Sequence, residues 1–424
     1  MKRAALLIIL LALCGCGGPA NMTTSSNFGF GERDFLHTSS LDSGSRSGES
    51  QLESFWDMPT LKKTPKFEIG KEVADGDVTV REIKYEVPAS DGRPIRIFAY
   101  YAYPAVKRNR KLPAIVWVHG GGSIADRNAV LHWASLGYAA LAMDLPGKGG
   151  EARAKSRSEG PDMSDPLIFT VTPSPRESYL YLCVNSVCRA ISFLRGREEV
   201  DPARIGVLGY SWGGVITLLA NGIDDRIAAA CTVYGAGYIF EESFWSHGQY
   251  ARLSLKEKKL WREYFDPSSY LRSLHGKMLF VGATQDIYYP LRSFVKTYRE
   301  AACAKALYII LNKNHELDET GEKTIERWFD WALRSGPTLP FVELKKANSG
   351  FELSTKDTSQ IAGVSLAVTD STDYTKAEWR SAELKFENGK WKADLPKHAA
   401  SALFTVRDGF GGAVAEVLRL TNAR

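Results

Sequence analysis

The sequence predicts an α/β fold built on a mostly parallel sheet, followed by a small all-β unit. Two observations support this organisation. Between residues 78 and 333, short apolar runs typical of buried strands alternate with segments of helical spacing. After Gly336-Pro337, apolar and polar residues instead alternate with period two, which is typical of strands that bury one face.

The α/β region begins with two strands that are expected to pair in antiparallel fashion, Val78–Val87 and Ile95–Tyr103. Further strands are expected at Ala114–Val118, Ala139–Met143, Ile205–Leu208, Ile227–Val233, Met278–Val281 and Tyr308–Leu311, and helices at Asn128–Leu136, Ser178–Leu194, Trp212–Ala220 and Ile325–Leu333. Strands that alternate with helices in this way form parallel sheets with helices on both faces. We therefore assign residues 56–336 to one α/β domain.

Residues 234–273 interrupt this alternation and are rich in aromatic and charged side chains. They lie between two core strands, so they are expected to project above the sheet. A pocket wall or lid and a simple surface excursion are both compatible with this composition.

Residues 337–424 are expected to form a β-sandwich-like C-terminal domain. Strands are expected at Gly363–Val368, Ala382–Phe386, Lys390–Ala393 and Ala402–Val406. Asn388-Gly389 is a strong signal for a two-residue hairpin turn. A structural role is favoured for this domain, with glycan binding as the alternative.

The N-terminus has the features of a bacterial export signal. Lys2 and Arg3 precede an apolar run that is too short to span a membrane as a helix. The run ends in Leu13-Cys14-Gly15-Cys16, which resembles the lipoprotein signal, in which a small residue precedes a lipidated cysteine. Cys16 fits this pattern better than Cys14, because Cys14 follows leucine.

Residues 1–15 are therefore predicted to be a signal peptide, with Cys16 the lipidated N-terminus. Residues 16–55 are rich in serine and glycine and are expected to form a flexible tether. An ordinary cleaved secretory signal is the alternative. In either case we expect export, and with the lipid we expect attachment to a membrane of the bacterial cell envelope.

Composition excludes several other classes of protein. The formal charge is +5, and no recognition motif accompanies the short basic cluster Lys107–Lys111, so nucleic acid is not an expected partner. Cys183 and Cys188 are five positions apart on an expected helix and cannot easily bridge, so buried free thiols are expected. No cysteine or histidine spacing indicates a metal site, and no cofactor is expected.

The stretch VLGYSWGG, Val207–Gly214, carries the strongest functional signal. An expected strand precedes it and an expected helix follows, so Ser211 is predicted to lie in a sharp strand-to-helix turn. Gly209 and Gly213 suit this turn because a side chain at either position would clash in the bend. The G-x-S-x-G pattern alone is weak evidence, but this context predicts that Ser211 is a nucleophile above a helix N-terminus.

A serine hydroxyl is a weak nucleophile and needs a base. Among the seven histidines, only His315 follows the last expected strand of the α/β region, where this architecture places the base. Asp286 follows the preceding strand and is predicted to fix the tautomer of His315. Asp318 is the alternative acid, but it is close to His315 in sequence and begins the next expected helix.

The loop Val118-His119-Gly120-Gly121-Gly122 is predicted to stabilise an oxyanion. Its glycines allow backbone N–H groups to face a substrate. We expect donors at the N–H groups of Gly121 and Trp212, with Gly122 as the alternate. His119 is predicted to hold this loop in place.

Four segments together resemble the α/β-hydrolases of the acetyl xylan esterase, cephalosporin-C deacetylase and dienelactone hydrolase group: DPARIGVLGYSWGG, VHGGG, GYAALAMDLPG and VGATQDIYYP. The resemblance covers about Val78 to Leu333. It implies the α/β-hydrolase fold and ester hydrolysis, and it implies the nucleophile, acid, base and oxyanion roles for Ser211, Asp286, His315, Gly121 and Trp212. Ser211 departs from the dienelactone hydrolases, which use cysteine.

Together these features predict a lipid-anchored serine esterase that cleaves short-acyl esters, in particular acetyl esters on carbohydrates. The aromatic residues Trp245, Tyr288 and Tyr289 are expected to narrow the substrate pocket. Because the predicted catalytic residues all precede Pro337, activity on small esters is expected without residues 337–424. Two alternatives are a peptidase similar to the prolyl oligopeptidases, which usually carry a long N-terminal propeller, and a non-catalytic binding lipoprotein.

Overall fold

The computed structural model describes Leu52 and residues 54–105, 110–148, 155–340, 342–347, 350–355 and 358–420. The predicted signal peptide, Cys16 and most of the predicted tether lie outside the described residues. Within these ranges, no helix is long and apolar enough to cross a membrane. The same part of the chain contains no group of three or more His, Cys, Asp or Glu side chains that could hold a metal ion.

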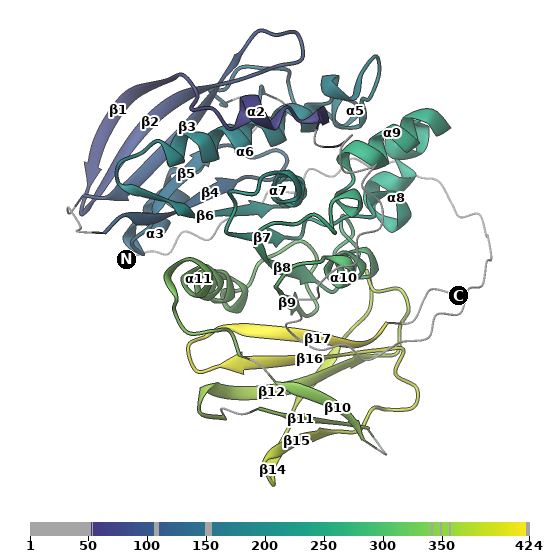
Figure 1. Cartoon of the computed structure of the whole chain (residues 1–424). Coiled ribbons are helices and arrows are strands. Elements are labelled where there is room, and N and C mark those ends of the chain that lie inside the picture. Colours follow the sequence, from purple (N-terminus) through teal and green to yellow (C-terminus); the bar gives the residue numbers. More distant parts are fainter. Residues whose placement is uncertain are drawn as a thin grey trace. The chain divides into compact units, whose positions relative to one another are not determined.

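A nine-stranded sheet forms the centre of the described α/β region, in the order β1-β2-β3-β5-β4-β6-β7-β8-β9 (Figure 1). Its strands are β1 (Phe67–Asp75), β2 (Val78–Val87), β3 (Ile95–Pro104), β4 (Leu112–Val118), β5 (Ala139–Met143), β6 (Val200–Tyr210), β7 (Ala229–Val233), β8 (Lys277–Ala283) and β9 (Lys305–Ile310). Strands β1 to β3 pair in antiparallel fashion, β3 pairs antiparallel with β5, and the other pairs are parallel. The mostly parallel sheet and its antiparallel start are as predicted.

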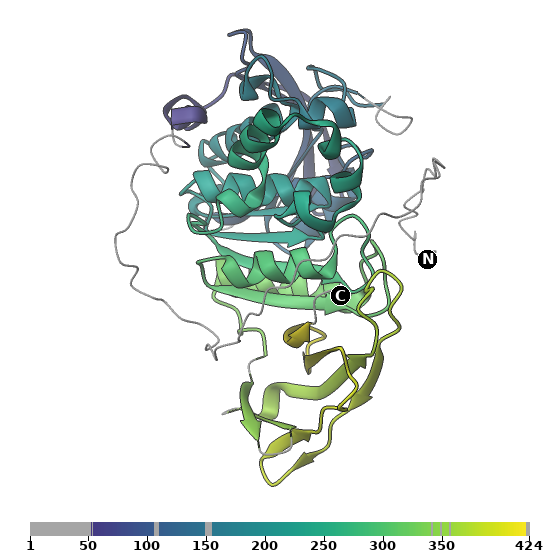
Figure 2. The ribbon, with the colours of Figure 1, turned by 90° about the vertical axis from the view of Figure 1, so that its right-hand side faces the viewer.

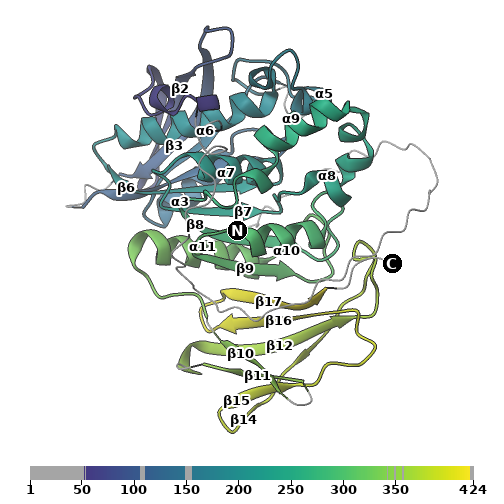
Figure 3. The same ribbon diagram turned by 45° about the vertical axis from the view of Figure 1, so that its right-hand side comes forward.

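Helices cover both faces of this sheet (Figure 3). The longer ones are α3 (Arg127–Ser135), α6 (Tyr179–Arg195), α7 (Trp212–Ile223), α10 (Leu291–Glu300) and α11 (Glu319–Arg334). On β6, a Cβ at Gly206 would meet Phe329 of α11, whereas one at Gly209 would meet Thr217 of α7. Because residues three apart on a strand face opposite sides, α7 and α11 lie on opposite faces. Helix α3 shares the α11 face, since the rings of Trp133 and Phe329 are 5.5 Å apart.

The remaining described helices of the α/β region are mostly short, apart from the 11-residue α9. They are α2 (Met58–Leu61), α5 (Asp165–Phe169), η1 (Pro175–Glu177) and, from the insertion after β7, α8 (Ile239–Glu242), η2 (Phe244–His247), η3 (Tyr250–Arg252), α9 (Leu255–Phe265) and η4 (Pro267–Ser269). Helix α9 begins with a capping box formed by Ser254 and Glu257. It is joined to α5 by a 3.1 Å hydrogen bond from Trp261 Nε1 to the carbonyl of Ile168.

The C-terminal residues form two four-stranded antiparallel sheets, β10-β11-β15-β14 and β13-β12-β16-β17. Their elements are β10 (Glu343–Ala347), β11 (Gly350–Ser354), η5 (Thr358–Gln360), β12 (Ile361–Thr369), β13 (Arg380–Glu383), β14 (Phe386–Glu387), β15 (Lys390–Ala393), β16 (Ser401–Asp408) and β17 (Ala413–Leu420). Asn388 and Gly389 both have positive φ and join β14 to β15, which confirms the predicted hairpin. The single strand predicted at Ala382–Phe386 is wrong, because the chain there leaves one sheet at β13 and enters the other at β14.

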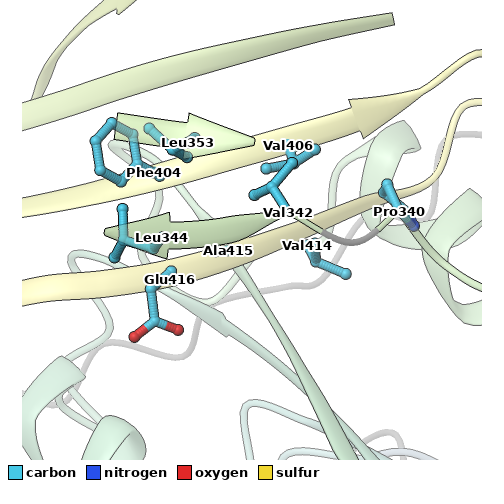
Figure 4. A pocket seen from close by; sticks show the side chains of 9 residues that line it. All are labelled: Pro340, Val342, Leu344, Leu353, Phe404, Val406, Val414, Ala415 and Glu416. Carbon is cyan, nitrogen blue, oxygen red and sulfur yellow. The ribbon is translucent and has the colours of Figure 1, made fainter. Parts of the chain in front are cut away.

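Apolar side chains from both sheets fill the space between them (Figure 4). Phe351 of β11 and Phe404 of β16 contact across this space, with ring centroids 6.3 Å apart. The Glu416 carboxylate of β17 points away from these apolar side chains (Figure 4). The C-terminal strands lie on the β9 side of the large sheet, where β17 packs beside β9 (Figures 1 and 2). This placement brings the C-terminal sheets close to the loops that follow β8 and β9.

Candidate active site

Ser211 occupies the turn between β6 and α7, with φ 56° and ψ −120°. A residue with a side chain rarely adopts such angles, and holding one there costs on the order of 1–3 kcal/mol. Two 2.8 Å hydrogen bonds fix the turn: the Ser211 N–H donates to the carbonyl of Val233, and the Ser211 carbonyl accepts from the N–H of Gly214. The predicted strand–turn–helix context of Ser211 is therefore confirmed.

The two glycines that flank the turn have no space for a side chain. A Cβ on Gly209 would lie 2.0 Å from the carbonyl oxygen of Gly213, and one on Gly213 would lie 2.3 Å from that of Val118. Both distances are far shorter than a van der Waals contact, so the close approach of α7 to the sheet requires glycine at both positions. This is the reason that the sequence predicts.

Asp286 and His315 are brought together from two neighbouring loops. His315 Nδ1 lies 2.8 Å from Asp286 Oδ2, and the Asp286 side chain is 1% exposed. The other carboxylate oxygen accepts the backbone N–H groups of Tyr288 at 2.8 Å and Tyr289 at 3.0 Å. With its carboxylate partner on Nδ1, the imidazole carries its proton there and leaves Nε2 free to accept one.

Asp318, the alternative acid, has a structural role instead. It is the N-cap of α11, and its Oδ1 accepts the N–H of Gly321 at 2.7 Å. Its second oxygen accepts the hydroxyl of Tyr308 at 3.0 Å. Both carboxylate oxygens are therefore engaged in holding the start of a helix.

Three tyrosine rings surround His315. Their centroids lie 4.4 Å (Tyr234), 5.2 Å (Tyr288) and 6.1 Å (Tyr289) from that of the imidazole. The sequence offers no signal for Tyr234, because an aromatic residue directly after a buried strand is most simply explained by the core. Its φ of 67° marks a tight turn after β7. The sequence does single out Tyr288 and Tyr289, as expected pocket residues.

Tyr289 contacts the imidazole of the predicted base, and its phenol lies next to the predicted nucleophile. Burial and the nearby Asp286 raise the pKa of Tyr289 well above its usual value, and the pKa of Tyr234 is raised for the same reasons. Both phenols therefore stay neutral. Among the described residues, neither buried phenol oxygen has a hydrogen bond of normal geometry. That of Tyr289 is next to the Ser211 hydroxyl.

The glycine loop after β4 lies against the nucleophile turn. A Cβ on Gly120 would be 3.1 Å from Ser211 Cβ, and one on Gly121 would be 3.0 Å from Trp212 Cδ1. Gly122 has φ +76°, which favours glycine. The backbone of this loop is therefore next to Ser211 and Trp212, as an oxyanion-binding loop requires.

His119 holds the glycine loop to the neighbouring strand end. The buried imidazole has Nδ1 2.7 Å from the carbonyl oxygen of Gly120, and its Nε2 accepts the N–H of Leu145 at 2.9 Å. An Nε2 that accepts a hydrogen bond leaves the proton on Nδ1, so both ring nitrogens have structural partners. The predicted structural role of His119 is confirmed.

Aromatic rings form a wall beside the serine turn. Trp245 of η2 lies with its ring centroid 4.6 Å from Trp212, 5.6 Å from Tyr288 and 5.4 Å from Tyr289. Phe169 of α5 contacts Trp212 from another side, at 6.1 Å. The structure thus brings together the three residues that the sequence assigns to the pocket. Phe169 is an addition that no sequence pattern connects to the site.

Comparisons with known proteins agree with the observed fold. Residues 41–241 match the model of the acetyl xylan esterase family. An acetyl xylan esterase from Paenibacillus sp. R4 is 25% identical, with a TM-score of 0.55 and coverage of 68% of this chain and 97% of that chain. Acetyl xylan esterase 1 from Thermoanaerobacterium sp. JW/SL YS485 shares the fold at 20% identity and a TM-score of 0.55, covering 66% of this chain and 92% of that one.

Matches to curated sequences are shorter. A thiohydrolase, apmlB, of Arthrinium phaeospermum is 29% identical over 153 residues, which are 35% of this chain and 42% of that one. The chain spans less than half the length of the curated relatives it matches.

The fold, the strand order and these matches together identify the chain as an α/β-hydrolase. Within that superfamily, the family model for residues 41–241 and the structures from Paenibacillus and Thermoanaerobacterium all carry an acetyl xylan esterase description.

Proposed function

We propose that the chain is a serine esterase in which Ser211 is the nucleophile, His315 the base and Asp286 the orienting acid. One observation carries the proposal: the His315–Asp286 hydrogen bond of 2.8 Å forms at the same edge of the sheet as the strained turn of Ser211. Carboxyl ends of parallel strands meet at this edge, so β6, β8 and β9 deliver the three side chains to one region.

In the proposed acylation step, Nε2 of His315 takes the proton of the Ser211 hydroxyl while the serine oxygen attacks the acyl carbonyl. The carbonyl oxygen becomes an oxyanion, which accepts hydrogen bonds from the N–H groups of Gly121 and Trp212. The imidazolium then gives its proton to the leaving alcohol, and the acyl group stays on the serine. Asp286 stabilises the imidazolium while it exists.

Deacylation repeats these steps with water as the nucleophile. His315 takes a proton from water, the hydroxide adds to the acyl carbonyl, and the returning proton releases Ser211. The products are the carboxylic acid and the free enzyme. The described residues contribute a base, an orienting carboxylate and backbone donors, which are the groups that this chemistry needs.

Short acyl groups are the proposed substrates, and acetyl groups on carbohydrates are the favoured class. The ring centroids of Trp212, Trp245 and Tyr289 lie within 6.4 Å of one another beside the serine turn, and this aromatic packing supports a short acyl group. The similarity to proteins described as acetyl xylan esterases supports the same class.

A covalent probe and a substrate panel test this proposal. A fluorophosphonate should label the parent protein at Ser211 and should not label Ser211→Ala. Aryl acetates and acetylated polysaccharides should be hydrolysed, whereas peptide amides should not. Cleavage of amides with no activity on esters would favour a peptidase, and failure of both labelling and hydrolysis would favour a binding protein.

Export and lipid attachment are also proposed, on the sequence alone. The apolar run that ends at Gly15-Cys16 supports cleavage before Cys16 and acylation of that cysteine. In a bacterial host, Cys16→Ala should lose labelling by a radioactive fatty acid and should leave the membrane fraction. Cys14→Ala is the matched control and should keep both. The reverse result would move the lipid to Cys14.

A further inference from the structure

One segment of the C-terminal sheets contacts the two loops that carry Asp286 and His315. This docking segment, residues 370–379, connects β12 to β13. The Asn312 side chain pairs with the backbone of Trp379 by two hydrogen bonds of 2.8 Å, donating from Nδ2 to the Trp379 carbonyl and accepting the Trp379 N–H at Oδ1. A pair of this kind fixes both the distance and the orientation of the two groups it joins.

Two further contacts reach the acid loop. Gln285, the residue before Asp286, donates from Nε2 to the carbonyl of Ala377 at 2.9 Å. Arg292, at the start of α10, donates to the carbonyl of Thr372 at 2.6 Å, and its guanidinium lies 4.5 Å from the centroid of the Tyr374 ring. The docking segment therefore contacts both ends of the loop that carries Asp286, at Gln285 and at the start of α10.

The acid and base loops are also joined to each other. Gln285 N–H donates to the carbonyl of Lys313 at 2.9 Å, and Asn312 N–H donates to Thr284 Oγ1 at 2.8 Å. Asn314 Oδ1 accepts the N–H of Ile287 at 3.1 Å. Gln285 and Asn312 thus take part in both sets of bonds, so the two loops and the docking segment form one network.

The docking segment is firmly held within its own unit. Tyr374, Ala377 and Trp379 are each at most 4% exposed, although they lie outside the strands. The Tyr374 hydroxyl is hydrogen-bonded to Ser401 Oγ of β16. Loops are commonly the least stable parts of a fold, and here the catalytic loops rest on a rigid support.

We infer that the docking segment is a positioning element of the catalytic apparatus, and that Gln285 and Asn312 are positioning residues that hold Asp286 and His315 in register. The inference rests on the proposed roles of Asp286 and His315. Under this inference, the predicted activity of the α/β region alone on small esters should be lower than that of the full chain. Catalytic groups must be held to within roughly 0.5 Å of their productive geometry, and a hydrogen-bonded support beneath both loops provides this.

Full-length variants test the inference. Gln285→Ala removes the bond to Ala377. Asn312→Gly removes both bonds to Trp379 and suits the φ of 54° that Asn312 adopts, where alanine would be strained. For the double variant we expect kcat on an aryl acetate to fall roughly 10- to 100-fold while KM stays within about twofold, because geometry is disturbed and binding is not.

The matched control is Arg327→Gln. Arg327 joins α11 to Asp408 of the C-terminal unit by a 3.0 Å ion pair, away from both catalytic loops. This variant should lower the melting temperature and leave kcat unchanged. An equal loss of kcat in the control would show that the C-terminal unit acts only through stability, and would overturn the inference.

A spectroscopic readout separates this inference from the proposed function. The proton between His315 Nδ1 and Asp286 should give a low-field resonance in the proton NMR spectrum of the parent, absent from His315→Ala. The resonance should broaden or disappear in the double variant and persist in Arg327→Gln. The resonance can be measured even if the protein hydrolyses no ester. Absence of hydrolysis would contradict the proposed function and would leave the positioning role intact. An unchanged resonance in the double variant would overturn the positioning role.

Discussion

The ring of Tyr289 stacks on the imidazole of His315, with planes 20° apart and centroids separated by 6.1 Å. The phenol oxygen of the same residue is buried next to the Ser211 hydroxyl without a hydrogen bond of normal geometry. Leaving a buried hydroxyl without a partner costs about 1–3 kcal/mol. The neutral Tyr289 phenol can therefore donate a hydrogen bond to an ester oxygen that enters the site.

We predict that Tyr289→Phe lowers kcat/KM on aryl acetates by roughly tenfold, the value of one hydrogen bond to the substrate. The same change should alter the stability of the resting protein by no more than about 1 kcal/mol, because the hydroxyl makes no hydrogen bond of normal geometry there. Tyr288→Phe is the matched control, since Tyr288 also contacts His315 but is only half-buried. Equal kcat/KM for Tyr289→Phe and the parent would mean that the phenol does not contact the substrate.

The triad assignment predicts opposite results at two aspartates. Ser211→Ala, His315→Ala and Asp286→Asn should keep the fold and lose roughly 10⁴-fold of kcat, and we expect Asp286→Asn to be the mildest of the three. Asp318→Ala should instead keep kcat and lose about 0.5–2 kcal/mol of stability, because Asp318 caps α11. Rates on an aryl acetate and denaturant titrations distinguish the two. Near-normal turnover by His315→Ala would remove the assignment.

The sequence predicts the elements that surround the serine because each has a distinct pattern. Strands such as β4 and β5 are buried on both faces and appear as continuous apolar runs. Strand β1 is not predicted, because most of its residues are exposed and the apolar alternation that Phe67 and Ile69 begin is interrupted at Lys71. The division at β13 and β14 is also missed, since alternation with period two does not reveal which sheet a strand joins.

The residues of the predicted triad can be found from the sequence, whereas the contacts that support them cannot. Ser211, Asp286 and His315 each follow a predicted strand, so chain order is enough to select them. The docking segment that supports their loops depends on hydrogen bonds between side chains and backbone groups distant in sequence, such as Asn312 to Trp379. Bonds of this kind produce no periodic pattern in the sequence. Tyr234 is missed because its place beside His315 depends on the turn after β7.

Glu416 on β17 predicts a pH-dependent stability. Burial raises the pKa of this carboxyl from 4.5 to about 7, while the cations Arg299 and Lys305 act in the opposite direction. Tyr298 faces the same group from α10, and the carboxylate raises its pKa further. Because the folded state holds the proton more tightly, the contribution of Glu416 to stability is fully present below about pH 4.5 and is lost as pH rises through about 7.

We predict that Glu416→Gln makes the protein more stable than the parent at pH 8, by up to about 3 kcal/mol, and leaves it close to the parent at pH 5. Melting temperatures measured at pH 5, 7 and 8 provide the check. Glu387→Gln, on the exposed strand β14, is the control and should follow the parent. If Glu416→Gln lost as much stability as the parent between pH 5 and 8, another group would be responsible.

The last prediction concerns the length of the acyl group. Trp245 is 5% exposed, and its ring centroid lies 4.6 Å from that of Trp212, the residue that follows the nucleophile. An open apolar groove would gain about 0.8 kcal/mol for each methylene buried, whereas a closed aromatic wall obstructs the extra carbons. We expect kcat/KM for an aryl acetate to exceed that for an aryl octanoate at least about tenfold, or roughly 1.4 kcal/mol. Trp245→Leu should lower the ratio of the acetate rate to the octanoate rate, because a smaller side chain admits longer acyl chains. Phe244→Ala is the control and should leave the ratio unchanged, since Phe244 is 53% exposed in the parent. A rate that rises from acetate to octanoate in the parent would instead indicate an open groove and a lipase-like or carboxylesterase activity.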